Sequence, residues 1–301
     1  MIKLRSNQAE RLDKVKTNEP ILTDQESILK DIAVFWDNTS NAWNAIWGPH
    51  IHHGFYDSKS SALSPKKAQE LLIEKLCSLI KLQPNQKILD VGCGLGYTAF
   101  YLAVHYHSIV TGITLSQYQI ERALETTKRL NLINLSFFIE DAHRLRRFQK
   151  EEFDIVWSLE SCEQFYDKAL FIQQAKRVLK PNGKLLLVTW CSSQEVFEGR
   201  DAENYISLCK RFNLPYMPTI QYYEKLLKDN FNRVEAYDWS ESVKQSWEEG
   251  QAKIKQFSYF DLFKLGGFSG LFYIRDVKKL ADAFLQGQIR YGVFVAEGPK
   301  L

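Results

Sequence analysis

Short apolar runs alternate with amphipathic stretches along the chain from residue 84 onward. Each run is rich in β-branched and aromatic residues, which is typical of strands buried on both faces of a parallel sheet. The stretches between the runs carry apolar residues at helical spacing. We therefore predict strands at 87–91, 109–113, 135–139, 153–158, 184–190, 233–239 and 290–296. This alternation predicts an α/β fold, with a doubly wound sheet of seven mostly parallel strands.

Capping residues mark where the helices begin and end. Ser64-Pro65 is typical of an N-cap followed by a first-turn proline. Ser116 and Gln119 form a capping-box pattern at the start of another helix. Asp167 is placed to cap a helix that ends before the proline-glycine stop at 180–183.

The chain divides into two predicted parts. Residues 1–60 are predicted to be an N-terminal helical segment, helical at least over 24–36, in which residues 1–20 lack structure. Residues 61–301 are predicted to be the main domain, with helical insertions at about 192–220 and 241–288. The second insertion is too long for an ordinary connection. We expect these segments to cover the carboxyl ends of the strands, where open α/β sheets bind ligands.

Composition excludes several classes of function. The net charge of +3 comes from intermixed charges, and the one basic cluster at 143–147 is short, so no nucleic-acid partner is expected. Five cysteines that never form C-x-x-C predict reduced thiols, with neither disulfides nor a metal site. No apolar leader or membrane-spanning run is present, so we expect a cytoplasmic protein without a transmembrane segment. The oligomeric state is left open.

The strongest chemical signal is the sequence K-I-L-D-V-G-C-G-L-G-Y at 87–97, where a strand enters a loop with three glycines. Glycines allow sharp turns and close approach of a ligand, and the following helix offers free N–H groups. The G-x-G-x-G spacing differs from the G-x-G-x-x-G of dinucleotide folds, and the next strand ends in Thr114-Leu115-Ser116 without a carboxylate. No P-loop sequence occurs. The loop looks like the S-adenosylmethionine loop of class I methyltransferases.

Several further motifs make this resemblance specific. The sequence I-W-G-P-H-I-H-H-G-F-Y at 46–56, the strand end at 110–116 and W-S-L-E-S-C-E at 157–163 resemble elements of the γ-tocopherol methyltransferase family. Pieces at 188–191, 208–215 and 238–241 also match, so the resemblance runs from about residue 35 to the end. The strand end and the E-x-x-E loop are also similar to cyclopropane-fatty-acid synthases and coclaurine-type N-methyltransferases.

The resemblance implies a Rossmann-like methyltransferase that uses S-adenosyl-L-methionine. Carried over position by position, it assigns the methionine part of the cofactor to the glycines and Asp90, the ribose and adenine to the next two strands, and a cover to the N-terminal motif. The implied cofactor residues are His53, Gly54, Asp90, Gly92, Gly94, Gly96, Thr114, Leu115, Gln119, Asp141, Ala142 and Ser158. Structural roles stay open: Gln119 completes a capping box, Asp141 could cap a turn, and His53 could be a hydrogen-bonded core residue.

The chain departs from the family at one position. Where the family has histidine after the second glutamate of the E-x-x-E loop, this chain has Gln164. Histidine is a natural base near neutral pH, whereas an amide cannot take a proton. Glu160 and Glu163 remain as candidate catalytic carboxylates beside Gln164, although each could instead cap a helix or pair with an arginine. The departure also leaves open a binding protein that has lost catalysis.

The insertion near the C-terminus suggests an apolar acceptor. Seven aromatic residues lie between Phe257 and Tyr273, which fits a pocket for an aromatic or prenyl group, the core of the insertion, or a membrane-touching face. We expect the acceptor pocket to contain Tyr56, Cys162, Trp190, Phe260, Phe263 and Phe268. The resemblance implies C-methylation of a prenylated aromatic or isoprenoid compound. Alternatives are methylation of a prenyl diphosphate alkene through a carbocation, and N-methylation of an amine.

Overall fold

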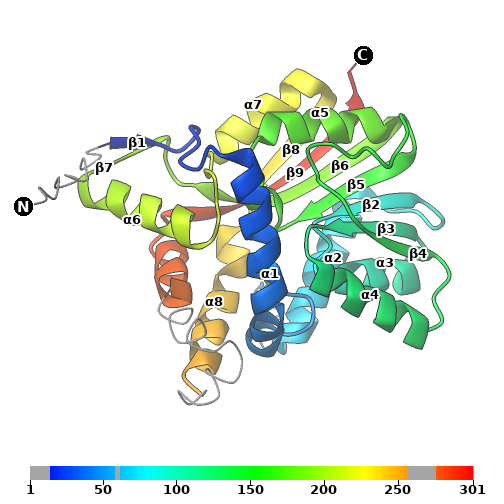
Figure 1. Cartoon of the computed structure of the whole chain (residues 1–301), viewed down its shortest axis with the longest axis horizontal. Helices are drawn as coiled ribbons and strands as arrows, with labels where there is room; N and C mark the ends of the chain where they lie inside the picture. The colour runs from blue at the N-terminus through cyan, green and yellow to red at the C-terminus, as the bar shows by residue number, and fades with distance from the viewer. Residues whose placement is uncertain (1–13, 58–61, 257–275, 301) are drawn as a thin grey trace, which may run out of the picture.

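A seven-stranded sheet forms the centre of the computed structural model, which describes residues 14–57, 62–256 and 276–300 (Figure 1). The strand order is β4-β3-β2-β5-β6-β9-β8, and β9 runs antiparallel to both of its neighbours, β6 and β8. The other pairs are parallel. The strands are β2 (Lys87–Val91), β3 (Ile109–Thr114), β4 (Leu135–Ile139), β5 (Phe153–Leu159), β6 (Leu179–Ser192), β8 (Phe231–Asp238) and β9 (Ile289–Pro299). The predicted fold class is confirmed.

Each of the seven predicted strands overlaps one strand of this sheet. The inner strands β2, β5, β6 and β9 are mostly buried on both sides, whereas the edge strands β4 and β8 are largely half-buried or exposed. The largest difference is at β6. The preceding helix ends at Val178 and the strand begins at Leu179, where the register with β5 shifts between Phe153 and Ile155. The proline-glycine segment at 180–183 therefore ends the helix as predicted, but lies in an irregular part of the strand.

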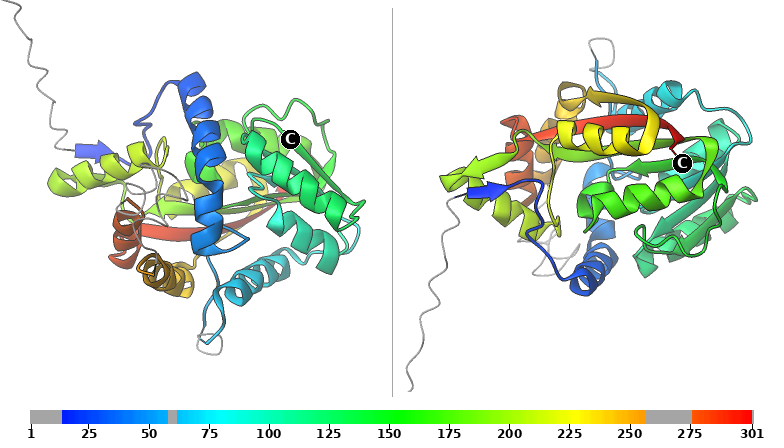
Figure 2. Two further views of the ribbon diagram at one scale, coloured as in Figure 1. Left: turned by 60° about the horizontal axis from the view of Figure 1, so that its bottom comes forward. Right: turned by 90° about the horizontal axis from the view of Figure 1, so that it is seen from above.

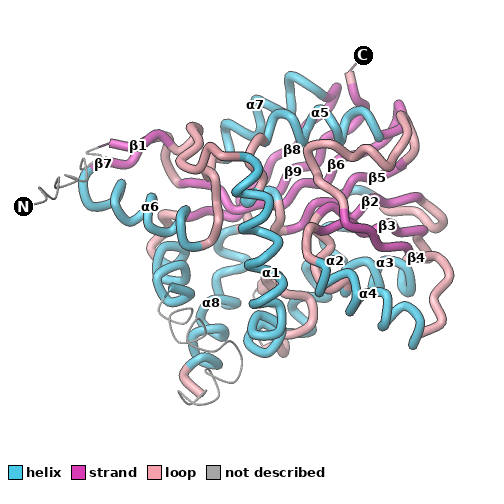
Figure 3. Tube along the Cα trace, in the orientation of Figure 1, coloured by secondary structure: helices cyan, strands magenta, loops and turns pink. Residues whose placement is uncertain are grey.

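Helices cover both faces of the sheet (Figures 1 and 3). One face packs on α5 and α7, and the other packs on α2, α3 and α4. The helices of the described residues are α1 (Gln25–Trp47), α2 (Pro65–Ile80), α3 (Tyr97–His105), α4 (Gln117–Arg129), α5 (Lys168–Val178), α6 (Gly199–Arg211), α7 (Ile220–Asn230) and α8 (Ser240–Ile254), with a 3-10 turn η1 (Cys162–Gln164) and a helical stretch at 276–285. None of them is both long and apolar enough to cross a membrane.

The predicted caps are present. Ser64 is the N-cap of α2, with Pro65 at the first helical position. The Oγ of Ser116 accepts a hydrogen bond from the backbone N of Gln119 (3.1 Å), and the carboxylate of Asp167 accepts from the N of Leu170 (2.8 Å). These contacts fix the first turns of α4 and α5. Both helices begin at a carboxyl-end loop of the sheet, so the caps also shape the region where a ligand would bind.

Helix α1 crosses the carboxyl ends of the strands and contacts α4 and α8 (Figures 1 and 2). It is longer than the predicted 24–36 stretch, because Trp43, Ile46 and Trp47 continue its buried face. Figure 2 shows the short strand β1 (Lys14–Lys16) beside α6, where it pairs with β7 (Val196–Glu198). Residues 14–16 are therefore structured, contrary to the expectation for 1–20.

Candidate active site

The glycine loop follows β2 and is tied to the neighbouring strand. The backbone N–H groups of Gly92 and Cys93 both donate to the carbonyl of Ile113, at 2.8 and 2.9 Å. Gly92, Gly94 and Gly96 have positive φ angles of 80°, 53° and 81°. Only glycine adopts such angles without strain. The local sequence therefore determines a loop that folds back over the end of the strand.

The three glycines are needed for different reasons. A Cβ on Gly92 would lie 2.2 Å from the Cβ of Ser161, and one on Gly96 would lie 2.9 Å from the ring of Phe137. A Cβ on Gly94 would meet nothing within 4 Å. Gly94 lines the larger of two adjoining cavities, so its missing side chain leaves room for a ligand next to the backbone.

The larger cavity lies between the ends of β2 and β3 and helix α1, with an empty volume of about 930 Å³ that is partly open to solvent. The size suits a small-molecule site. Eight of the twelve predicted cofactor residues line it: Asp90, Gly92, Gly94, Thr114, Leu115, Gln119, Asp141 and Ala142. Gly96 lies behind the loop as the N-cap of α3.

Asp90 places a buried carboxyl group in the wall of this cavity. Its Oδ2 has no hydrogen-bond partner among the described residues, and burial raises the pKa of the carboxyl to about 7. An unpaired buried carboxylate costs free energy unless a cation or a donor meets it. The ammonium group of S-adenosylmethionine is such a partner. Asp90 and the open space at Gly94 thus fit the methionine part of this cofactor.

The far wall of the cavity is built from polar groups with well-defined partners. The Oγ1 of Thr114 donates to the Oε1 of Gln119 (2.7 Å), and the Nε2 of Gln119 donates to the Oγ of Ser40 (3.0 Å). Gln119 therefore completes the helix cap through its backbone and orders the cavity wall through its side chain. The position of Gln119 is compatible with both roles that the sequence suggested, a helix cap and a cofactor contact.

Asp141 also combines a structural contact with a place in the cavity wall. Its Oδ1 accepts from the backbone N of His143 (2.9 Å) and lies 2.7 Å from the Nδ1 of that residue. Burial raises the pKa of Asp141, but the His143 contacts outweigh it, so the net shift is downward. The Oδ2 lies 3.4 Å from the Nε of Arg144 and has no hydrogen-bond partner in the described part of the chain. This oxygen can accept from a ligand amino group.

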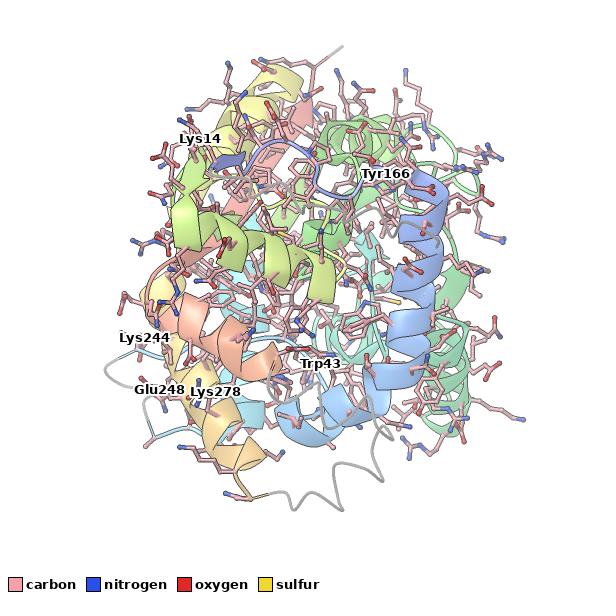
Figure 4. All side chains as sticks on the ribbon, turned by 60° about the vertical axis from the view of Figure 1, so that its left-hand side comes forward. Lys14, Trp43, Tyr166, Lys244, Glu248 and Lys278 are labelled. Carbon is pink, nitrogen blue, oxygen red and sulfur yellow. The ribbon has the colours of Figure 1, made fainter. Side chains whose placement is uncertain are left out.

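A second cavity of about 510 Å³ adjoins the first and shares Trp36, Ile51, His52, Glu160 and Gln164 with it. Aromatic rings form most of its wall. The remaining lining residues are Phe35, Trp43, Trp47, His53, Glu163, Trp190, Phe212, Leu214 and Trp247. In Figure 4, Tyr166 lies beside the first turns of α1 and Trp43 near its opposite end, so this helix extends along the site. A molecule in the second cavity would lie beside one in the first.

Glu160 lies on the boundary of the two cavities, just after β5. Its Oε1 accepts a hydrogen bond from the backbone N of His53 (2.8 Å). Its Oε2 lies 2.8 Å from the Nδ1 of the same histidine. The hydroxyl of Tyr291 donates to the same carboxylate at 2.7 Å. Burial raises the pKa of Glu160, but the contacts with His53 outweigh it and the net shift is downward. Glu160 is therefore a buried anion with three donors around it.

Glu163 and Gln164 occupy η1 and have different environments. Burial and then the nearby Glu160 raise the pKa of Glu163 to about 8, and the hydroxyl of Thr189 donates to its carboxyl group at 3.0 Å. Gln164 accepts from the indole Nε1 of Trp36 (2.7 Å) and donates to the carbonyl of Phe212 (2.9 Å). Gln164 thus connects η1 to α1 and to the end of α6.

Several predicted site residues lie elsewhere. His53 lines the second cavity and not the first, and Gly54 packs against Ala68 outside both. Tyr56 donates to Glu249 beside a smaller hollow. Cys162 is buried 3.9 Å from the hydroxyl of Tyr223, and Ser158 is buried beside the Oγ of Ser161. Of the predicted acceptor residues, Trp190 lines the second cavity, and Phe260, Phe263 and Phe268 lie outside the described residues.

Other lining residues escaped the sequence analysis as site residues. Trp36, Trp43 and Trp47 lie on one side of α1, and their spacing of seven and four positions is the signal that could have identified a shared helical face. Ser161 gave no such signal. Its Oγ donates to the carbonyl of Val91 (2.7 Å), which joins the E-x-x-E loop to the glycine loop. Trp247 comes from α8, far along the chain.

Known proteins are similar to this chain in both sequence and fold. A family model described as a methyltransferase domain matches residues 82–251. The chain is 31% identical over 294 residues to the chloroplastic tocopherol O-methyltransferase of Arabidopsis thaliana, covering 92% of this chain and 84% of that protein. It is 37% identical over 147 residues to the 2-methyl-6-phytyl-1,4-hydroquinone methyltransferase of a Synechocystis species, covering 48% of this chain and 45% of that protein.

A solved structure extends the likeness to the whole fold. A cyclopropane synthase of Mycobacterium tuberculosis superposes with a TM-score of 0.79 at 19% identity, covering 89% of this chain and 98% of that one. These findings confirm the predicted enzyme class and its cofactor, S-adenosylmethionine. The family model and the relatives are named as methyltransferases, so the chain is an enzyme and not a binding protein of the same fold. The chain belongs to the class I S-adenosylmethionine-dependent methyltransferases, of the tocopherol methyltransferase-like type.

Proposed function

We propose that this methyltransferase transfers the methyl group of S-adenosylmethionine to a ring carbon of a prenylated phenol or hydroquinone. The observation that carries the proposal is the second cavity, which is walled by aromatic rings and shares Glu160 and Trp36 with the cofactor cavity. Methyl transfer is an in-line displacement, so the acceptor atom must lie next to the sulfonium methyl. A pocket joined to the cofactor cavity meets this requirement.

The composition of the wall supports an apolar, π-rich acceptor. Trp43, Trp47, Trp190 and Trp247 are buried and surround a volume of about 510 Å³. Their rings provide large apolar surfaces for an aromatic ring or a prenyl group. Indole faces also attract the sulfonium charge. A charged hydrophilic acceptor would lose its hydration there with few groups to replace it.

The charges at the boundary support the same acceptor. Glu163 has a pKa of about 8 and is therefore mostly neutral at pH 7, which leaves Glu160 as the anion of the pair. Methyl transfer from a sulfonium to a neutral or phenolate acceptor disperses or cancels charge, and a site with little water favours this change. Two carboxylates, one neutral and one charged, can serve different steps of a proton transfer.

The names of the relatives also support a prenylated ring as the acceptor. One is named for tocopherol and another for a phytyl hydroquinone, and both names describe a hydroxylated ring that carries an isoprenoid chain. The first name specifies O-methylation, whereas the second specifies no atom. The position of the added methyl group must therefore be part of the test.

The aromatic wall also favours a second candidate, the methylation of an alkene such as a prenyl diphosphate. Adding a methyl cation to a double bond creates a carbocation, which aromatic faces such as Trp190 stabilise. A carboxylate such as Glu160 would then remove a proton from the neighbouring carbon. This candidate shares the pocket with the first and differs in the acceptor.

An acceptor screen separates the candidates. The purified enzyme with S-adenosylmethionine is offered a phytyl hydroquinone, a chromanol, geranyl diphosphate, and hydrophilic amines and acids, and mass spectrometry detects the gain of one methyl group. We expect methylation of the prenylated ring, with the methyl group placed on carbon by NMR. Methylation of geranyl diphosphate alone would establish the second candidate, and methylation of hydrophilic amines alone would refute both.

A pair of tryptophan variants tests the pocket itself. Trp190→Ala enlarges the second cavity, so KM for the accepted ring should rise, while S-adenosylhomocysteine binding should stay near the wild-type value. Trp239→Ala is the control, because Trp239 packs against Phe55 and lines neither cavity. Equal KM values for the two variants would contradict the assignment of the acceptor pocket.

A further inference from the structure

His53 is held by a carboxylate that comes from the opposite side of the site. Its Nδ1 lies 2.8 Å from one oxygen of Glu160, and its backbone N donates to the other at 2.8 Å. Because a carboxylate can only accept, the Nδ1 carries the hydrogen. In the neutral imidazole, the Nε2 is then the atom with a free lone pair. The ring is thus fixed in one tautomer.

The Nε2 of His53 is buried without a hydrogen-bond partner among the described residues. The ring belongs to the wall of the second cavity, with its centroid 5.0 Å from that of Trp247 and 5.7 Å from that of Trp47. Buried polar atoms in folded proteins are nearly always paired, so an unpaired one at a cavity indicates a partner that binds there. A phenolic hydroxyl of the acceptor can supply that partner.

The backbone of Glu160 adopts an unfavourable conformation. Its φ angle of 51° lies in the left-handed region, which a residue with a Cβ adopts only under constraint. Its backbone N donates to the carbonyl of Val188 (2.8 Å), and the Tyr291 hydroxyl donates to its carboxylate (2.7 Å). Such strained residues cluster at functional sites. Glu160 is therefore placed to orient the imidazole of His53, as a carboxylate orients the base in catalytic pairs of this kind.

We propose that His53 is the catalytic base of the methyl transfer, with Glu160 and Tyr291 as positioning residues. The inference rests on the proposed function, a phenolic acceptor in the second cavity. A base at position 53 does not require a histidine at position 164, where this chain has Gln164. Gln164 instead holds Trp36 and Phe212 in place.

The proton and the methyl group move in opposite directions in this step. The acceptor hydroxyl gives its proton to the Nε2 of His53, and the electron density reaches the ring carbon, which forms a bond to the methyl carbon. The bond between sulfur and that carbon breaks, and its electron pair stays on sulfur as S-adenosylhomocysteine. The methylated ring then loses its carbon-bound proton to water, and the oxygen takes back a proton from the imidazolium. One proton is released to solvent in total.

Four titratable groups face His53 or adjoin it. Glu160 and Tyr291 form the network with its Nδ1, and Glu163 lies on the same wall of the cavity. His52 donates from its Nδ1 to the carbonyl of His53 (2.7 Å). The remaining close neighbours are the aromatic rings of Trp47, Trp190, Trp247 and Phe284, which do not titrate. A pH profile must therefore be compared with variants of His53 itself.

The first experiment measures kcat and KM with phytyl hydroquinone across pH. His53→Asn keeps a side-chain N–H for Glu160 and removes the Nε2. We expect kcat to fall about 100- to 1,000-fold, as for loss of a general base, and the acidic limb of the pH profile to disappear. The kcat values of Glu160→Gln and Tyr291→Phe should fall between those of wild type and His53→Asn. Tyr291→Phe should preserve the affinity for S-adenosylhomocysteine, because Tyr291 lines neither cavity. His105→Asn, on the exposed end of α3, is the matched histidine control.

A retained kcat and acidic limb in a folded His53→Asn protein would overturn the proposal. If that variant is unstable, His53→Gln provides the second measurement, since its longer amide reaches toward the Nε2 position. The thermal midpoint and S-adenosylhomocysteine binding report folding for both variants.

A second experiment does not depend on turnover. An alkylated para-nitrophenol is bound to the enzyme with S-adenosylhomocysteine, and its phenolate absorbance is followed at a pH below its own pKa. Wild type should bind it as the phenolate, and His53→Asn as the neutral phenol. The same ionisation state in both proteins would overturn the role of His53. If no prenylated ring is methylated in the acceptor screen, the proposed function fails by itself, and this measurement still decides the role of His53.

Discussion

Trp36 and Gln164 are joined by a 2.7 Å hydrogen bond from the indole Nε1 to the amide Oε1, across 128 positions of the chain. The amide also donates to the carbonyl of Phe212 at 2.9 Å. One side chain therefore ties helix α1 to η1 and to the end of α6, and both cavities lie against it. Gln164 holds the cover of the site in place.

Gln164→Ala should loosen this cover. The indole N–H and the Phe212 carbonyl lose their partner, which should lower the free energy of unfolding by about 1–3 kcal/mol. S-adenosylhomocysteine should dissociate faster, because α1 lines the cofactor cavity through Trp36 and Ile32. Chemical denaturation and stopped-flow dissociation measure the two effects. Gln117→Ala, on the exposed surface of α4, should change neither, and an unchanged dissociation rate in Gln164→Ala would contradict the prediction.

Gly94→Ala should weaken cofactor binding about tenfold or more. The new Cβ points into the cavity, and displacing a ligand from a buried hydrogen bond costs about 1–3 kcal/mol, which is about tenfold at 1.4 kcal/mol. Gly92 is a poorer test, because its Cβ would collide with Ser161 and disturb the loop itself.

Gly199→Ala provides the matched control for Gly94. Gly199 has a φ of 52°, close to the 53° of Gly94, and its Cβ would also meet nothing within 4 Å. It lines neither cavity. Both variants should lose similar stability through backbone strain, but only Gly94→Ala should lose affinity in calorimetry with S-adenosylhomocysteine. Equal affinities would show that the glycine loop does not contact the ligand.

Cofactor binding should depend on pH through Asp90. Burial raises the pKa of this carboxyl to about 7, so the free enzyme is increasingly protonated below that pH. Pairing with an ammonium group requires the carboxylate, so affinity should fall as pH drops below about 7, by at most about tenfold per pH unit. Calorimetry in buffers of different ionisation enthalpy should detect proton release on binding. Asp90→Asn should bind weakly at all pH values; a wild-type slope in this variant would assign the titration to another group.

Glu163→Gln should stabilise the enzyme in alkaline solution. The folded pKa of Glu163 is about 8 against an ordinary value of 4.5, so the folded state binds the proton more tightly than the unfolded chain. The free energy of unfolding therefore falls as pH rises from about 4.5 to about 8. The amide removes this loss and can still accept from Thr189.

The thermal midpoint measured against pH checks this prediction. Glu163→Gln should melt above wild type at pH 9, and the difference should shrink toward pH 5. Glu248→Gln is the control, because Glu248 is exposed on α8 (Figure 4). A midpoint difference that does not change with pH would show that the Glu163 carboxyl is not the group that titrates.

Local patterns in the sequence were sufficient for the sheet and the cofactor loop. The strands predicted at 87–91 and 135–139 coincide with β2 and β4. The run of β2 is buried on both faces, as an uninterrupted apolar run predicts, whereas the edge strand β4 is only partly buried. The caps at Ser116 and Asp167 form within three residues. The three glycines of the loop have positive φ angles that their own backbone requires. All of these features depend on neighbours close in the chain.

Only the tertiary structure decided which side chains meet. His53 was assigned to the cofactor from the resemblance, and its partner Glu160 lies 107 positions away. Tyr56 and Cys162 belong to the matching motifs but point into packing contacts with Glu249 and Tyr223. The sequence determined each segment, because periodicity and capping are local. The second cavity depends on how α1, β6 and α8 pack together, and no short pattern contains that information.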